Sequence, residues 1–287
     1  MLNAMTVDVE EWFQVSNFDA LVDRSAWDSY PSRVVDSTRT LLSLLEMRDT
    51  RATFFVLGWV AERQPDLVAE IADAGHEVAS HGYGHELVYR LSPEAFAEDL
   101  TRSLDALMRC GVASVEGYRA PSFSMDARTR WAWDVLAERG IKFDSSIYPV
   151  RHPRYGTPEF SRFPVTLRTP EGQTVREFPL TTLRVLGNNV GASGGGYLRV
   201  FPPAIIRTAI TQANRAGHPA VVYVHPWELD PAQPRLPVRG LGRVTHYTNL
   251  AATYDRLDDL LARFRFGTMT DALREAAGVE APVVEVP

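Results

Sequence analysis

Residues 5–12 read MTVDVEEW, a short apolar and β-branched run that ends abruptly in acidic residues. Its first part, 5–9, has the composition of a buried strand. Similar runs recur at residues 52–57, 77–80 and 220–224, and amphipathic stretches separate them. Repeated alternation of strand and helix predicts a parallel sheet, and at 287 residues a (β/α) barrel is its economical closure. The sequence therefore predicts a fold of the α/β class.

The intervening segments have the periodicity and punctuation of helices. Residues 92–94 supply a serine cap and a proline at the first helical position, and glycines follow several of the helical runs. The predicted helices span residues 32–47, 65–74, 93–108, 126–139 and 202–216. From 151 to 200 the periodicity weakens, which predicts a long excursion with a short strand at 175–180. We expect one domain with an elaborated second half and a frayed tail at 280–287.

Composition narrows the range of partners. The 36 acidic and 30 basic residues give a formal net charge of -6, so the overall charge offers no footprint for nucleic acid or an anionic membrane. The single cysteine, Cys110, can form no internal disulfide. The first residues lack the basic and apolar regions of a signal peptide, and no apolar run reaches the roughly 20 residues of a membrane span. We therefore expect a cytoplasmic protein without a membrane span.

Acidic side chains gather where the first predicted strand ends. Asp8 lies in the last residues of this strand, and Glu10 and Glu11 follow it directly. In a parallel barrel, the carboxyl ends of the strands form the face on which active sites are built. The cluster is therefore a candidate site, although an exposed strand end would also carry acids.

Two histidines follow the strand at 77–80, in the segment SHGYGH of residues 80–85. His81 and His85 are four residues apart, so both rings face one ion if the segment coils as a helical turn. Neutral histidine is the commonest nitrogen ligand of zinc. Either ring would equally suit a hydrogen bond to a backbone carbonyl, so the pair indicates a metal only together with further ligands.

Three more polar side chains stand at predicted strand ends. Arg119, in GYRAPS, can keep a neighbouring carboxylate ionised and orient it through a bidentate pair, or form a purely structural ion pair. Asp144, in FDSSIYP, follows a short strand and would also suit a turn or a helix cap. His225 ends the apolar strand of VVYVHPWE, before a proline, and is difficult to explain by packing alone.

Together these motifs resemble the carbohydrate esterase family 4 deacetylases, also called the NodB-homology or polysaccharide deacetylase family. The order along the chain matches: an acid pair, His-x-x-x-His, Arg-x-Pro, Asp, and an apolar strand ending in His. The chain is most similar to the branch associated with exopolysaccharide synthesis and exosortase loci, which has a C-terminal extension. The segments that carry this resemblance are residues 8–10, 119–124, 143–147, 193–197, 225–228 and 266–268.

The resemblance implies a distorted, seven-stranded (β/α) barrel and a polysaccharide deacetylase domain over residues 1–279. The core motifs would occupy residues 5–230, a branch-specific extension 231–279, and a tail 280–287. It also implies a carbohydrate substrate and one divalent metal ion, for which zinc is the first candidate.

The resemblance also implies a role for individual residues. Five side chains would act on the metal or the substrate: the general base Asp8, the metal ligands Glu10, His81 and His85, and the general acid His225. Arg119 would orient Asp8, and Asp144 would hold His225. The backbone N–H of Ser122 would help to stabilise the oxyanion.

These roles suit the hydrolysis of an amide. A Lewis acid with an open coordination position polarises the carbonyl and lowers the pKa of a bound water toward ~7, while separate groups accept and donate protons. In the commonest pattern of the family two adjacent Asp residues supply base and ligand, whereas here Val9 separates Asp8 from Glu10. Glu10 and Glu11 both remain candidates for the carboxylate ligand.

Aromatic and glycine residues suggest a surface for the sugar. Trp12, Tyr197 and Trp227 are candidates for stacking on sugar rings, and each would equally suit a core position. The glycines at 194–196 lack the Lys-Ser/Thr of a phosphate-binding loop, which favours a flexible lip beside the substrate or an ordinary loop.

We therefore expect a metal-dependent hydrolase that removes N-acetyl groups from a polysaccharide or oligosaccharide of N-acetylglucosamine type, in exopolysaccharide or cell-wall modification. Three alternatives remain open at this point: an allantoinase-like amidohydrolase of small molecules, an O-acetyl xylan esterase, and a non-catalytic sugar-binding module. The polymer and the oligomeric state are not indicated by the sequence.

Overall fold

Strand β1 (Asn3–Val9) lies at the centre of the architecture. In the computed structural model, which describes residues 1–152, 154–276 and 281–286, β1 pairs in parallel with β10 (Val221–Val224) and with β2 (Thr53–Val56). The sheet continues in parallel through β3 (Glu77–Ser80), β4 (Gly117–Tyr118), β5 (Phe143–Asp144) and β7 (Thr174–Glu177). The order β10-β1-β2-β3-β4-β5-β7 contains the parallel strands expected of the barrel.

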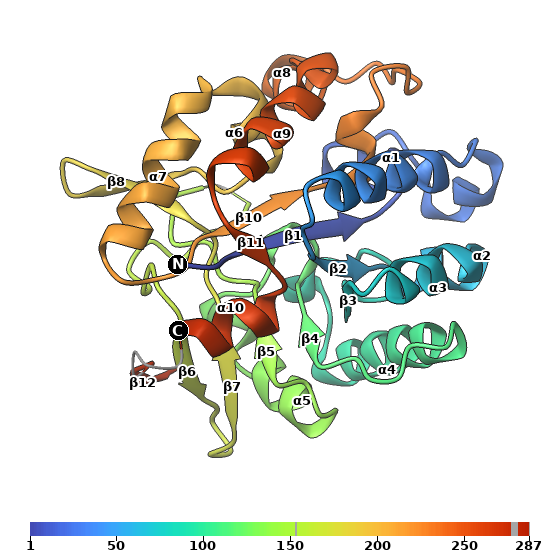
Figure 1. Cartoon of the computed structure of the whole chain (residues 1–287). Coiled ribbons are helices and arrows are strands. Elements are labelled where there is room, and N and C mark those ends of the chain that lie inside the picture. The colour runs from blue at the N-terminus through green and yellow to red at the C-terminus, as the bar shows by residue number, and fades with distance from the viewer. Residues whose placement is uncertain (153, 277–280, 287) are drawn as a thin grey trace.

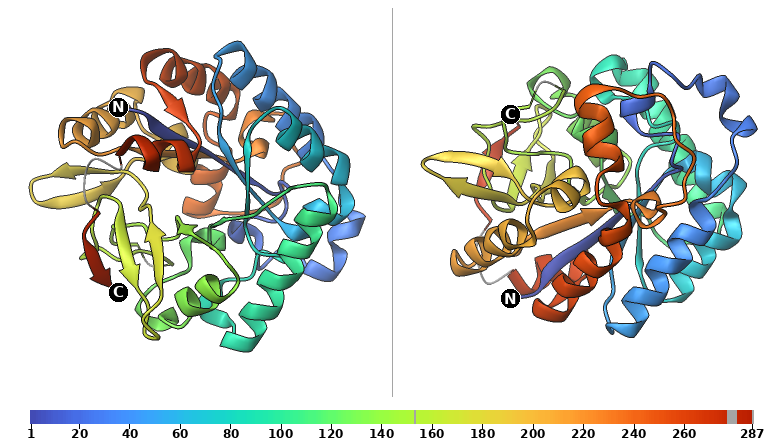
Figure 2. Two further views of the ribbon diagram at one scale, coloured as in Figure 1. Left: turned by 60° about the horizontal axis from the view of Figure 1, so that its bottom comes forward. Right: turned by 90° about the horizontal axis from the view of Figure 1, so that it is seen from above.

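Helices surround these strands on their outer side (Figures 1 and 2). They are α1 (Val34–Met47), α2 (Gly58–Arg63), α3 (Pro65–Asp73), α4 (Pro93–Arg109), α5 (Ala132–Glu138), α6 (Gly195–Val200), α7 (Pro203–Arg215), α8 (Gly240–Tyr247), α9 (Thr253–Arg263) and α10 (Met269–Glu275). The helix expected at 126–139 begins later, because a 3-10 turn at Ala127–Thr129 precedes α5. Among the described residues, no helix is long and apolar enough to cross a membrane.

The barrel is distorted where β7 should meet β10. No ladder joins these two strands in the described part of the chain, and irregular backbone fills the space between them. Phe178 N donates to Asp144 O at 2.8 Å, and Tyr223 N donates to Ser193 O at 2.9 Å. A Cβ on Gly194 would lie 1.8 Å from the Tyr223 carbonyl oxygen. The glycine run, predicted to be a flexible lip, is therefore needed for close packing against β10.

The remaining strands extend the sheet or stand apart from it. β6 (Val165–Arg168) runs antiparallel to β7, β11 (Phe266–Gly267) pairs with β1, and β8 (Thr182–Val185) forms a separate hairpin with β9 (Asn188–Gly191). β12 (Val283–Glu285) pairs in parallel with β6. This pairing differs from the frayed tail expected at 280–287, of which residues 280 and 287 lie outside the described residues.

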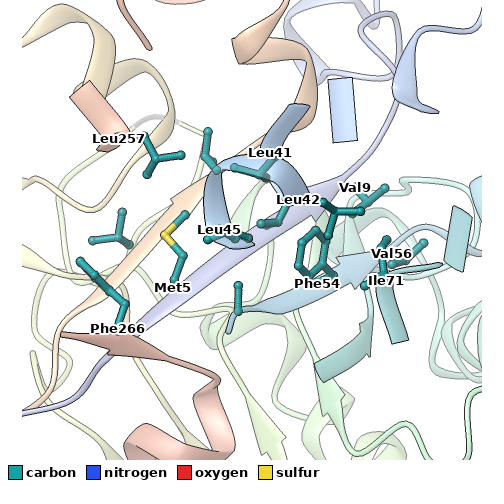
Figure 3. Close-up of a cluster of buried hydrophobic side chains, with 14 of the residues drawn as sticks. Met5, Val9, Leu41, Leu42, Leu45, Phe54, Val56, Ile71, Leu257 and Phe266 are labelled. Carbon is teal, nitrogen blue, oxygen red and sulfur yellow. The ribbon is translucent and has the colours of Figure 1, made fainter. Parts of the chain in front are cut away.

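Side chains along β1 alternate between two faces of the sheet, as the period of a strand requires. Met5, Val7 and Val9 belong to the core between the sheet and the helices, where Figure 3 shows Met5 and Val9 with leucines of α1. Ala4 belongs to a separate apolar cluster inside the barrel. Asp8 has the parity of Ala4, so the alternation directs it inward rather than toward the helices.

Candidate metal centre and active site

The alternation of side chains along β1 directs the three acids at its end to two different faces. Glu10 is two residues beyond Asp8, so both side chains leave the same face of the chain. Glu11 leaves the opposite face, where its Oε2 accepts from Arg33 N at 3.0 Å and its Oε1 accepts from Ser32, next to the start of α1. Glu10 is therefore the carboxylate that lies beside the two histidines. Val9, between the two inward-facing acids, packs in the core between the sheet and the helices.

His81 and His85 are held by the backbone that follows β3. The segment between them is irregular, with φ of +75° at Gly82 and +53° at His85, so the expected helical turn is wrong. The two imidazoles nevertheless converge on Glu10, and one ligand atom from each of the three residues lies within 4.8 Å of the others. His85 Nε2 is 2.9 Å from Glu10 Oε2.

The three buried side chains fit a divalent cation. His81 Nδ1 lies 2.8 Å from Arg119 O, which it reaches as a donor, so its Nε2 lone pair is free for a metal. Trp227 Nε1 donates to Glu10 Oε1 at 3.0 Å, while Glu10 Oε2 is buried without a hydrogen bond among the described residues. Two imidazoles and a carboxylate are a ligand set that zinc accepts, with a further position left open.

The electrostatics favour the protonation states that a metal needs. Burial lowers the pKa of His81 to about 4, so the ring is neutral at pH 7. Burial by itself raises the pKa of Glu10, but attraction to His85, whose Nε2 lies 2.9 Å away, with smaller contributions from His225 and His81, brings the pKa down to about 2. The site therefore presents a carboxylate and a neutral imidazole.

Asp8 is oriented by a fully buried arginine. Arg119 Nη1 donates to Asp8 Oδ1 at 2.7 Å and to Thr6 Oγ1 at 2.8 Å, and Arg119 Nε donates to Ser145 O at 3.1 Å. These bonds fix the guanidinium between two strands. Asp8 Oδ2 makes no bond to Arg119 and lies 3.9 Å from His225 Nε2. The structure thus brings Asp8, Arg119 and His225 together, as the motif order predicted.

His225 is held by Glu228, which the sequence reasoning did not single out. His225 Nδ1 lies 2.7 Å from Glu228 Oε1, and Arg199 Nε donates to Glu228 Oε2 at 2.5 Å. Arg199 and Glu228 are almost completely buried. Burial alone lowers the pKa of His225, but the bond to Glu228 and attraction to Glu10 and Glu228 raise it to about 9. Burial opposes ionisation of Glu228, whose pKa Arg199 nevertheless lowers to about 2.

Asp144 does not hold His225, contrary to the prediction. Its Oδ2 accepts from Trp133 Nε1 at 3.0 Å and its Oδ1 accepts from Ser146 Oγ at 2.5 Å. Burial raises its pKa, as expected for a carboxyl group packed inside the sheet. Glu228 reaches the imidazole more easily because both belong to one turn, the 3-10 helix at Pro226–Leu229 and its cap. A Glu three residues after the histidine was the available sequence signal.

The three aromatic candidates have different environments. Trp12 is 2% exposed and donates to Pro31 O, so its ring offers little surface to a sugar. Trp227 is stacked between His225 and His246, with ring centroids 5.0 and 4.3 Å away, and it orients Glu10 rather than standing free. Tyr197 is partly exposed and lies 3.3 Å from Tyr155 through their hydroxyl oxygens.

Ser122 lies in the 3-10 turn Pro121–Phe123, directly after the strand end that carries Arg119. Its φ of +51° is unusual for a serine, and its hydroxyl is 2.7 Å from that of Ser16. The turn therefore holds its backbone in a conformation that few side chains adopt.

Two sequence families match consecutive parts of the chain. Residues 23–143 match the family described as "Polysaccharide deacetylase", and residues 145–274 match "Domain of unknown function (DUF3473)". The first match contains His81, His85 and Arg119, and the second contains Arg199, His225 and Glu228.

Curated relatives cover part of the chain. The chain is 36% identical to a chitooligosaccharide deacetylase of Bradyrhizobium over 101 residues. This aligned segment covers 35% of this chain and 43% of that protein. Over 99 residues the chain is 26% identical to a peptidoglycan-N-acetylglucosamine deacetylase of Bacillus cereus, 34% of this chain and 36% of that protein. The chain thus spans less than half the length of these relatives.

The fold has relatives among crystal structures. A protein assigned to the polysaccharide deacetylases from Mycobacterium smegmatis superposes with a TM-score of 0.62 at 23% identity, over 97% of this chain and 91% of that one. This likeness confirms the fold, a distorted (β/α) barrel with parallel strands.

Proposed function

Because residues 23–143 of this chain belong to the polysaccharide deacetylase family, we propose that the protein is a metal-dependent hydrolase acting on an acetylated polysaccharide or oligosaccharide. Its substrate would carry N-acetylglucosamine-type units, and the bond cleaved would be the acetamide. The observation that carries the proposal is the buried group of Glu10, His81 and His85, with Asp8 and His225 beside it. A sugar-binding module would have no use for a base and an acid at one such site.

Glu10, His81 and His85 are our candidate ligands for one divalent ion, with zinc favoured by the two imidazoles. When bound, such an ion polarises the acetyl carbonyl and lowers the pKa of a water molecule. Trp227 supports this site by holding Glu10 Oε1, which leaves Oε2 for the ion. Hydrogen bonds of this kind fix ligands in the geometry that binding needs.

Asp8 is the candidate general base. Arg119 occupies Asp8 Oδ1 and leaves Oδ2 to accept a proton from the attacking water. The Ser122 N–H would stabilise the acyl oxygen, and Tyr197 would line the substrate side of the site.

His225 is the candidate general acid. Glu228 accepts the Nδ1 proton, so Nε2 is the nitrogen that donates a proton to the departing amine. A pKa of about 9 keeps the ring protonated at neutral pH. Asp144, which we had expected in this supporting role, would stabilise the sheet below the site instead.

The test is acetate release from chitin oligomers, peptidoglycan fragments and acetylated xylan, with and without a chelator. We expect release from the N-acetylated substrates, its loss with chelator, and about one divalent ion per chain by elemental analysis. Release from xylan alone would make the protein an O-deacetylase. No release from any substrate by protein that contains its metal would contradict the proposal.

A further inference from the structure

The C-terminal third of the chain contains a basic stretch in an otherwise acidic protein. Between Asp230 and Asp255 the sequence has no acidic residue, and it has three arginines, Arg235, Arg239 and Arg243. This segment is therefore positively charged, whereas the whole chain has a net charge of -6.

The three arginines line one hollow on the surface. The hollow has a volume of about 300 Å³, and its remaining walls are Leu236, Pro237, Val238 and Tyr247. All three arginines are exposed, and none forms an ion pair among the described residues. Elsewhere exposed arginines commonly have acidic partners, as Arg39 has Glu70. Three like charges that converge without a counter-charge repel one another, so an anion would relieve the repulsion.

The hollow packs against residues that support the candidate active site. Leu236, Val238 and Tyr247 pack on the aromatic cluster that contains Trp227, the residue bonded to Glu10. Helix α8, which carries Arg243, lies at the top of Figure 1 beside α6. A Cβ on Gly196 would lie 3.3 Å from the carbonyl oxygen of Thr245, so α8 packs against the first turn of α6, which carries Tyr197.

A fourth arginine lies near α8 but comes from another segment. Arg154 Nη1 donates to Asn17 Oδ1 at 3.4 Å, and a Cβ on Gly242 in α8 would lie 4.0 Å from Asn17 Cγ. Arg154 is exposed and has no ion pair in the described residues. Two separate parts of the chain therefore place arginines without an ion pair, among the described residues, close to α8.

We propose that this arginine-lined hollow is a binding subsite for the carboxylate groups of an acidic polysaccharide, so that the substrate is an anionic glycan. This inference rests on the proposed function. A planar guanidinium binds a carboxylate through two parallel hydrogen bonds, and the Arg235 guanidinium lies over the Tyr247 ring, 5.3 Å from its centroid, which restricts its position in the hollow. The volume of the hollow is at the lower end for small-ligand pockets, which suits one or two sugar units rather than a long segment.

An anionic membrane is the competing occupant, because Leu241 and Val244 are exposed on the same helix. The glycan is favoured because the arginines line a concave hollow, whereas a bilayer meets a convex surface. The experiment therefore includes lipid vesicles as a separate arm.

The experiment compares two triple variants of the full chain. The first carries Arg235→Gln, Arg239→Gln and Arg243→Gln. The matched control removes three exposed arginines near the opposite ends of the strands, through Arg51→Gln, Arg109→Gln and Arg215→Gln. Both change the net charge by the same amount. Binding of hexagalacturonate, of chitohexaose and of vesicles containing phosphatidylglycerol is measured by calorimetry, so the result does not depend on turnover.

We expect the unmodified protein to bind hexagalacturonate more tightly than chitohexaose, with an affinity that falls as salt is added. The first variant should bind hexagalacturonate about tenfold more weakly, since each exposed ion pair contributes about a two- to fivefold effect. The control variant should bind both oligomers normally and should release acetate from chitohexaose at the unmodified rate.

Three results would overturn the inference. These are no preference of the unmodified protein for the anionic oligomer, equal losses in both variants, and a loss confined to vesicles containing phosphatidylglycerol. A failure of the proposed function would appear differently, as absent acetate release from chitohexaose whatever the binding results.

Discussion

The replacement Glu228→Gln tests whether this buried carboxylate sets the proton affinity of His225. Glu228 Oε1 is 2.7 Å from His225 Nδ1, while the neighbouring Arg199 holds Oε2. An amide at this position can still accept a hydrogen bond but carries no charge. The imidazolium would therefore lose its closest counter-charge.

The structure gives the size of the effect. The pKa of His225 is about 9, against an ordinary value of 6.5, and Glu228 contributes both a hydrogen bond and a Coulombic attraction. Loss of a close opposite charge lowers the pKa of a cationic group by roughly one unit or more. If the pKa falls from about 9 to about 8, the protonated fraction at pH 8.5 falls from about three quarters to about one quarter.

The assay is kcat/KM against pH on one acetylated oligosaccharide, because this ratio reports the acid and base of the free enzyme. His225 acts in its protonated form, so activity declines as pH rises through its pKa, and the variant should decline at a lower pH. A bound cation repels the imidazolium in both proteins, so the difference between them is the quantity to measure.

A second variant separates this effect from a loss of stability. Gln at position 228 leaves Arg199 buried without its counter-charge, which costs about 3–5 kcal/mol of unfolding free energy. The double variant Arg199→Met with Glu228→Gln removes both charges and should recover much of that loss. Asp144→Asn is the matched control, because its carboxyl contacts Trp133 and not His225. An alkaline limb that stays in place in both Glu228 variants would refute the reasoning.

Three further predictions concern the ends of the central strands. Asp8→Asn should retain the metal, measured by elemental analysis, but should lower kcat by roughly 10²–10⁴-fold, because an amide cannot accept the proton; near-normal turnover would exclude Asp8 as the base. Glu10→Gln should lose metal under dialysis, whereas Glu11→Gln should retain it and lose only thermal stability, since Glu11 bonds to the start of α1; equal metal loss would contradict the parity argument. Gly194→Ala should lower the unfolding free energy by about 1–3 kcal/mol or more in a denaturant titration, because its Cβ would overlap the Tyr223 carbonyl oxygen; unchanged stability would show that the backbone can move apart.

Much of the candidate site was predictable because it consists of strand ends. Asp8, Arg119 and His225 each follow an apolar run, and the ends of parallel strands must meet on one face. The pairing of Arg119 with Asp8 follows from that geometry. The partner of His225 was not predictable in the same way. Asp144 and Glu228 both lie at or just after strand ends, so the sequence allows either carboxylate to reach the imidazole. Only the packed structure shows that the local turn brings Glu228 to the ring.

The sequence by itself determined the α/β class and the strand ends at which Asp8, Arg119 and His225 lie, because periodicity and strand-end position are local properties of the chain. Tertiary structure alone decided the rest. It directed Glu10 inward and Glu11 outward, it buried Trp12, and it placed a β12 strand on β6 where an unpaired tail was expected. These features depend on which surfaces come into contact when distant segments pack. Only this packing decides which groups are buried and which hydrogen-bond partners and counter-charges they have.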